Sequence, residues 1–257
     1  MRSQDYIITK DEVHGYANHW LNSALRLEYE GYKCNGTVLL QILLIAAARV
    51  VSLAAACLDL ADAPSDQTIR DALAATLPGI AELERRLNLA LVTDVPKALR
   101  RKSRIIAIDL TLIPYHGQPA FDKKEIYRSK AKSGTTHFHA YATAVVVHKG
   151  YRYTLALTHV ERGEAMKDVV QRLLRIVRRR GVKIRFLLLD KGFYSVEVIT
   201  YLKRARYGFV IPVALRGRKP KRGTPVTGVR ALLRKKTATI GTRSRESVAT
   251  RKTPRPK

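Results

Sequence analysis

Cysteine is scarce in this sequence: Cys34 and Cys57 are the only two among 257 residues. Two isolated cysteines exclude a disulfide framework and a zinc site built on clustered thiolates. We therefore expect a protein of a reducing compartment, the cytoplasm. The first residues, Met1 to Tyr6, also lack the apolar core and the small cleavage residues of a signal peptide.

Negative charge is also in short supply, with 21 Asp and Glu against 48 Lys and Arg, a formal net charge of +27. This imbalance indicates a polyanionic partner, because basic side chains release the counterions that condense on phosphates. Nucleic acid is the leading expectation, and an acidic membrane surface is the second. A hydrophobic content of 46% is sufficient for a core and argues against a wholly disordered basic protein.

Long hydrophobic runs are absent with one exception, Val38 to Leu58, which is long enough to be considered as a membrane span. Arg49 lies inside this run, and a charge at the centre of a span costs roughly 2.5–3.5 kcal/mol. We therefore expect a buried helix of a soluble domain, and no membrane partner.

Residues 1–100 have the hydrophobic pattern of helices, and we expect them to form a helical DNA-binding region. The expected helices are Glu12–Tyr29, Thr37–Leu60, Ser65–Leu77 and Ile80–Leu91.

Pro64 cannot continue a helix and Ser65 is a good N-cap, which predicts the outline of a helix-turn-helix at about residues 38–77. Two interpretations stay open for its second helix. Either Gln67, Thr68 and Arg70 contact bases in the major groove, or the two helices form an ordinary hairpin.

From Ser103 onward the periodicity changes to that of strands, with helices between the later ones. The expected strands are Ile105–Leu110, His137–His148, Tyr151–His159, Lys183–Leu189 and Phe209–Val213. The expected helices are Glu164–Arg180 and Val196–Arg206. We therefore expect an α/β (α+β) chain in which a ribonuclease-H-like mixed sheet with flanking helices occupies residues 101–215.

Residues 216–257 hold fifteen Lys and Arg and a single acid, Glu246. Few apolar residues are available there to form a core. We expect a basic, largely disordered tail that gains order only on a polyanion.

Asp109 and Asp190 each follow a short apolar run that is typical of a buried strand. In the expected sheet the first and fourth strands are neighbours, so both carboxylates lie near the carboxyl ends of strands, where ligands bind. Two adjacent carboxylates repel each other unless a cation compensates, and Mg²⁺ or Mn²⁺ prefers oxygen ligands. The pair predicts a metal site for phosphodiester cleavage.

Alternatives remain for these residues and their neighbours. Each aspartate taken alone is also typical of a turn or a helix cap. A nuclease that completes its site with Glu164 or Asp168 is a further hypothesis. Five histidines are scattered over the expected strands: His116, His137, His139, His148 and His159. Alternation puts His137 and His139 on one face, where they are more typical of partners for acids or phosphates than of metal ligands.

Four segments together resemble the DDE transposases of insertion sequences. Within that family they resemble most a group that is common in archaea. They are Asp109–Gly117, Tyr127–Thr143, Arg152–Ala156 and Leu189–Tyr194. The resemblance runs through roughly residues 35–215. It implies a cut-and-paste DNA transposase with a ribonuclease-H-like catalytic domain, in which Asp109 and Asp190 are the first and second acids of the catalytic triad.

The same resemblance implies a third acid, usually Glu on a helix that follows an inserted β-rich region. This sequence ends before such a region, and Glu246 lacks the expected surroundings, so we expect a C-terminally truncated and impaired enzyme. The alternative is a non-catalytic DNA-binding protein that regulates transposition. In either case double-stranded DNA, bound by a homodimer, is the expected partner, with phosphate contacts from Arg128, Lys130, Lys132 and Lys191.

Overall fold

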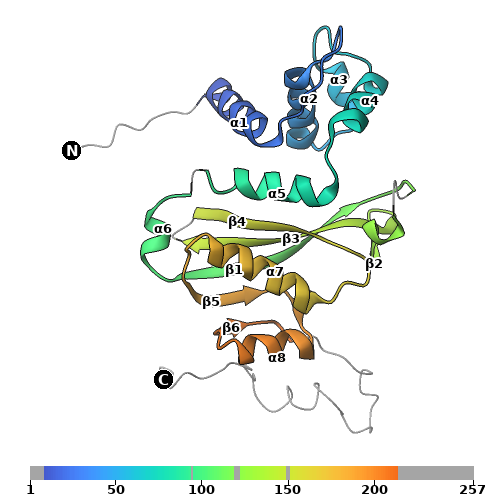
Figure 1. Cartoon of the computed structure of the whole chain (residues 1–257). Coiled ribbons are helices and arrows are strands. Elements are labelled where there is room, and N and C mark those ends of the chain that lie inside the picture. The colour runs from blue at the N-terminus through green and yellow to red at the C-terminus, as the bar shows by residue number, and fades with distance from the viewer. Residues whose placement is uncertain (1–8, 94, 119–121, 149–150, 214–257) are drawn as a thin grey trace, which may run out of the picture. The chain divides into compact units, whose positions relative to one another are not determined.

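The computed structural model describes residues 9–93, 95–118, 122–148 and 151–213 (Figure 1). The chain divides into two compact units, residues 1–94 and 95–257, and each has its own hydrophobic core. The expected basic tail, with Glu246, lies outside the described residues.

The first unit is helical, as the sequence predicts. Its helices are α1 (Lys10–Leu25), α2 (Gly36–Arg49), α3 (Leu53–Leu58), α4 (Asp66–Thr76) and α5 (Ile80–Ala90). The apolar faces of α2, α3 and α4 meet in a core of Leu27, Leu39, Ile42, Ala56, Ile69 and Ala72, together with both cysteines. None of the described helices is long and apolar enough to cross a membrane.

The prediction of a single helix over Thr37–Leu60 is wrong. Val50 adopts a left-handed conformation with φ 55° and ends α2, and the Ser52 side chain accepts a hydrogen bond from the Ala55 N–H to begin α3. A serine N-cap within an apolar run was the available signal for this break. The long apolar run is therefore two short helices rather than one span.

The predicted helix after Pro64 is confirmed as α4. The Ser65 hydroxyl accepts a hydrogen bond from the Thr68 N–H, which satisfies one of the free donors at the start of the helix. Ile69 and Ala72 are fully buried and fix the inward side of the helix.

The second unit is a mixed sheet with helices. Its strands are β1 (Arg104–Pro114), β2 (Tyr127–Lys132), β3 (Thr135–His148), β4 (Tyr151–Val160), β5 (Ile184–Leu189) and β6 (Phe209–Val210). Its α-helices are α6 (Ala98–Arg101), α7 (Met166–Arg179) and α8 (Val196–Arg204), with short 3-10 turns at Lys123–Glu125 and Lys191–Phe193.

The strand order is β2-β3-β1-β5-β6, with β4 also paired to β3. β3 pairs antiparallel with β1, β2 and β4, whereas β1, β5 and β6 run parallel. Crossover helices α7 and α8 lead into β5 and β6, as parallel connections require. The α/β class and the ribonuclease-H-like arrangement expected from the sequence are confirmed.

α7 covers one face of the sheet, on β3 and β4 (Figure 1). Its buried side chains recur at steps of three and four residues: Val169, Val170, Leu173, Leu174 and Val177. Full burial of such an aliphatic side chain contributes about 1.5–3 kcal/mol. They meet alternate residues of the central strands, Ile106, Ile108, Ala144 and Val146, in the core of this unit.

Strand β2 was not predicted. Its sequence is polar and carries Arg128, Lys130 and Lys132, so it lacks the alternating apolar pattern of a strand. Pairing with β3 is made possible by a two-residue turn at Ser133 and Gly134, both with positive φ (52° and 76°). Other boundaries also moved: β1 continues to Pro114, and β6 ends at Val210 rather than Val213.

Candidate active site

The sequence suggested that Asp109 lies near the end of its strand. In the structure Asp109 lies within β1, which continues to Pro114. Residues 110–114 continue the strand because they pair with Phe138–Ala142 of β3. Asp109 itself is opposite Thr143 of β3, and its side chain is exposed.

Asp190 directly follows β5, which pairs in parallel with β1. The last register pair is Ile108 with Leu189, and the Asp190 N–H donates to the Ile108 carbonyl at 3.3 Å. The ladder thus extends by one further position, at which Asp190 is next to Asp109. Neighbouring strands lie about 4.8 Å apart, so the two backbones are close although the residues are distant in sequence.

Both aspartates project from the same face of the sheet. Side chains alternate along a strand, and partners in register share a face. Ile108 and Leu189 are buried on the face that α7 covers. Asp109 and Asp190, one position further, therefore point to the opposite face, where both side chains are exposed.

Backbone N–H groups hold each carboxylate by one oxygen. Asp109 Oδ1 accepts from the Leu110 N–H at 2.9 Å, and Asp190 Oδ2 accepts from the Gly192 N–H at 3.3 Å. The second oxygen of each carboxylate has no hydrogen-bond partner among the described residues. Two oriented carboxylates, each with an oxygen available, suit a hard divalent cation.

A third ligand does not join them within the part of the chain that the structure describes. No group of three or more His, Cys, Asp or Glu that could hold a metal occurs there. Glu164 instead binds Arg172 at 2.6 Å, and Asp168 pairs with Lys167 at 3.3 Å. The hypothesis that Glu164 or Asp168 completes the site is therefore wrong.

Along the same face, polar and aromatic side chains continue from Asp109 toward β3 and β4. Tyr141 is opposite Thr111, and its ring contacts His159 edge to face at a centroid distance of 5.5 Å. His139 contacts Tyr115 in the same way at 4.7 Å. Burial raises the pKa of the Tyr141 phenol. The histidines were expected from the sequence but their aromatic partners were not, although the alternation along residues 137–141 was an available signal for them.

The basic residues expected to contact phosphate lie on two separate elements, and all four are exposed. Lys191 follows Asp190 in the 3-10 turn, directly beside the acid pair. Arg128, Lys130 and Lys132 lie on β2. Arg128 Nη1 is 3.3 Å from both Thr136 Oγ1 and His137 Nδ1, at a cavity of about 300 Å³ that Lys123 and Arg162 also line.

In the first unit, the three side chains expected to read bases are bound within their own helix. Gln67 donates to Asp71 at 2.8 Å, Arg70 donates to Asp66 at 3.4 Å, and the Thr68 hydroxyl is 2.9 Å from the Ser65 hydroxyl. Gln67 and Arg70 remain exposed. These weak surface contacts are compatible with either interpretation of the helix pair.

Residues 100–255 match the family model described as the transposase DDE domain. The chain belongs to this family. No curated protein matches it significantly. Membership of the DDE transposase family agrees with the resemblance carried by the segments around Asp109 and Asp190.

Three solved structures are similar to this member of the DDE transposase family. An intasome of simian T-cell lymphotropic virus in complex with PP2A regulatory subunit B56 gamma has 19% identity and a TM-score of 0.29 over 55% of this chain and 47% of that one. The Drosophila P element transposase strand transfer complex has 12% identity and a TM-score of 0.37 over 78% of this chain and 43% of that one. The Mos1 transposase paired-end complex with left transposon end has 13% identity and a TM-score of 0.26 over 80% of this chain and 68% of that one. The chain thus spans about half the length of the first two.

Proposed function

We propose that this chain is the DNA transposase of an insertion sequence and that Asp109 and Asp190 are the first two acids of its DDE-type site. The observation that carries the proposal is their neighbouring register on β1 and β5, on the exposed face of the sheet, in a chain of this family. The net charge of +27 supports DNA as the substrate.

In this proposal the free oxygens of Asp109 and Asp190 hold Mg²⁺ or Mn²⁺. Such an ion would supply Lewis-acid chemistry for the cleavage of a phosphodiester. The backbone N–H groups of Leu110 and Gly192 keep the two carboxylates oriented, so little reorganisation is needed on binding. Lys191, beside Asp190, contacts a phosphate of the bound strand.

The test is nicking of duplex DNA that carries the element's ends, with and without added Mg²⁺ or Mn²⁺. Asp109→Asn and Asp190→Asn keep an oxygen for the backbone contact but lose the charge. We expect each to reduce the metal-dependent rate by on the order of 10²-fold or more, since a hard ligand contributes several kcal/mol. Asp168→Asn, which removes an exposed carboxylate away from the pair, is the matched control and should nick like the wild type.

A second candidate function is DNA binding without catalysis, as a regulator of transposition. The absence of a third acid beside Asp109 and Asp190, within the described residues, favours it. DNA binding by the wild type with no nicking in either metal would select this function. Sedimentation of the protein with end-containing duplex would establish whether two copies bind together, as we propose for both functions.

A further inference from the structure

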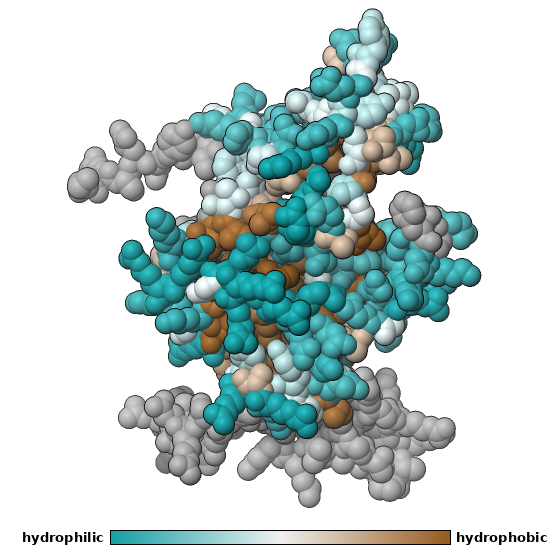
Figure 2. Space-filling model, in the orientation of Figure 1, coloured by the Kyte–Doolittle hydropathy of each residue, from teal (hydrophilic) through white to brown (hydrophobic). Residues whose placement is uncertain are grey.

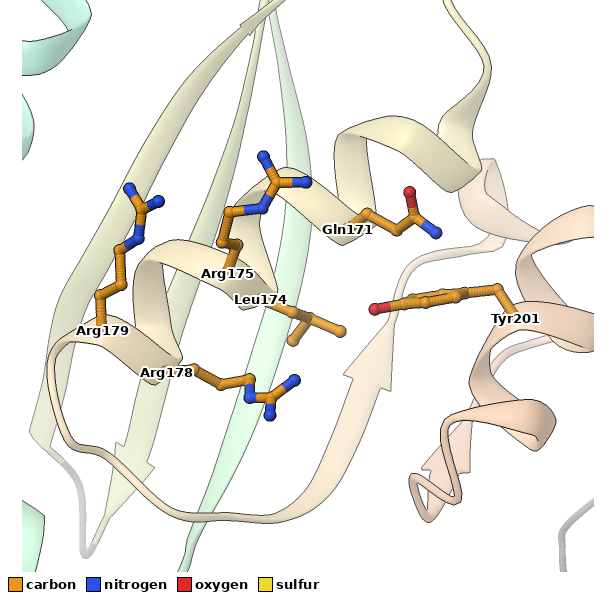
Figure 3. A pocket seen from close by; sticks show the side chains of 6 residues that line it. All are labelled: Gln171, Leu174, Arg175, Arg178, Arg179 and Tyr201. Carbon is orange, nitrogen blue, oxygen red and sulfur yellow. The ribbon is translucent and has the colours of Figure 1, made fainter.

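A cleft of about 620 Å³ lies between α7 and α8 in the second unit. Figure 3 shows Tyr201 of α8 pointing toward α7, from which the other lining side chains project. These are Gln171, Leu174, Arg175, Arg178 and Arg179. The cleft therefore joins a buried leucine, a phenol, an amide and three guanidinium groups, and none of the described residues that line it is acidic.

The three guanidinium groups carry uncompensated charge. Within the described residues the side chains of Arg175, Arg178 and Arg179 have no ion-pair or hydrogen-bond partner, and all three are exposed. Arg172, one turn earlier, differs because it binds Glu164. Like charges at spacings of three and four residues destabilise an isolated helix by roughly 0.2–0.5 kcal/mol per pair.

Helix chemistry alone explains only part of this arrangement. Arg178 and Arg179 lie in the last turn, where cations stabilise the helix dipole. Arg175 lies a turn earlier and gains little from the dipole. Burial raises the pKa of the Tyr201 phenol. The positive charges of Arg178 and Arg175 oppose that rise, so both guanidinium groups act on the phenol across the cleft. Tyr201 stays protonated at neutral pH and can donate a hydrogen bond.

The cleft is remote from the acid pair. α7 packs on the face of the sheet opposite to that from which Asp109 and Asp190 project. The arginines also precede the start of β5, whereas Asp190 follows its end, and six residues of strand span about 20 Å. A phosphate in the cleft therefore belongs to a different stretch of DNA from the one at the carboxylates.

We propose that the α7–α8 cleft is a second DNA-binding site, which holds backbone phosphates of a duplex segment outside the reacting strand. Arg175 and Arg178 supply the charge, and Gln171 and Tyr201 donate to phosphate oxygens. Over the middle of the second unit, where α7 lies, Figure 2 shows hydrophilic residues with hydrophobic ones between them. Exposed arginines there suit a sequence-independent contact with the DNA backbone. The inference rests on the proposed action on DNA.

The test is the salt dependence of binding of the full chain to a labelled 30-base-pair duplex of arbitrary sequence, by fluorescence anisotropy. Each phosphate contact contributes about 0.9 to the slope of log K against log salt. Arg175→Gln with Arg178→Gln should lower the magnitude of that slope by about two. Lys97→Gln with Lys203→Gln removes the same charge from exposed residues outside the cleft and should leave the slope unchanged. Circular dichroism of both variants checks that they fold.

A local readout complements the slope. Gln171→Cys, labelled with a benzophenone maleimide, should crosslink to the duplex, and added Arg175→Gln and Arg178→Gln should abolish that crosslink. The native Cys34 and Cys57 are buried, and the unsubstituted chain serves as the background.

Four outcomes would overturn the inference. An unchanged slope in the cleft variant, or an equal loss in the Lys97 and Lys203 variant, excludes a specific site. A cleft variant that loses binding of a poly-glutamate peptide but keeps DNA binding indicates an acidic protein partner. In these three cases metal-dependent nicking by the wild type leaves the proposed function standing. Failure of the wild type to bind any duplex would overturn both proposals.

Discussion

His139 projects from β3 onto the same face as Asp109, and its environment disfavours the charged ring. Burial, and next the nearby His159, lower its pKa below the ordinary value. The unfolded chain then binds more protons as the pH falls below about 6.5, so stability should decrease there and level off once the pH is under the folded pKa. His139→Phe keeps the ring contact with Tyr115 and should flatten the fall in melting temperature between pH 7 and pH 5.

The control for this titration is His14→Gln, at an exposed position on α1. It should leave the pH dependence of the melting temperature as it is in the wild type. An unchanged pH profile in His139→Phe would show that other groups dominate acid destabilisation.

The two aspartates of the candidate site could be predicted because the apolar residues before each of them indicate a strand. Asp109 and Asp190 follow apolar runs, and once the strand order is known the parallel register makes them neighbours. Glu164 was a wrong candidate because its carboxylate pairs with Arg172. These two residues are eight positions apart, and only the folded structure brings their side chains together. Such side-chain pairings depend on packing, which periodicity does not encode.

Helix α7 packs on the sheet, and its buried residue Leu173 allows the contribution of this packing to stability to be measured. Leu173 is fully buried in the core of the second unit. Leu173→Ala should lower the free energy of unfolding by about 2–5 kcal/mol, because it removes buried apolar surface and leaves a residual cavity. Urea unfolding followed by circular dichroism measures it.

The matched substitution is Leu58→Ala, because that side chain is 88% exposed on α3. Its effect should stay within about 0.5 kcal/mol, as for surface positions generally. Equal losses at the two positions would contradict the packing described for α7.

Element prediction succeeded where local chemistry and periodicity agreed, as in α4, with its serine cap, and α7, with its regular apolar stripe. It failed for β2, whose basic sequence forms a strand only because β3 offers a pairing edge across the Ser133–Gly134 turn. It also failed at Val50, where an apolar residue in a left-handed conformation ends α2. Tertiary context decided both cases.

At the scale of the whole molecule, charge is distributed unevenly along the chain. The described part of the second unit combines an exposed acid pair with basic side chains on β2 and α7. Residues 216–257 add fifteen Lys and Arg against Glu246 alone. If the chain acts on DNA as we propose, long-range attraction of DNA would involve charges along the entire chain, whereas cleavage would depend on two carboxylates.

The basic segment after residue 215 should thus contribute to affinity in a way that does not depend on DNA sequence. Arg234→Gln, Lys235→Gln and Lys236→Gln together should reduce the salt slope by up to about three, near 0.9 for each phosphate that is no longer neutralised. Arg234→Lys, Lys235→Arg and Lys236→Arg preserve the charge and should preserve the slope. The reduction should be equal for duplexes with and without the element's ends. A reduction confined to one sequence, or seen equally in the charge-preserving variant, would mean that these residues read bases or shape rather than supply charge.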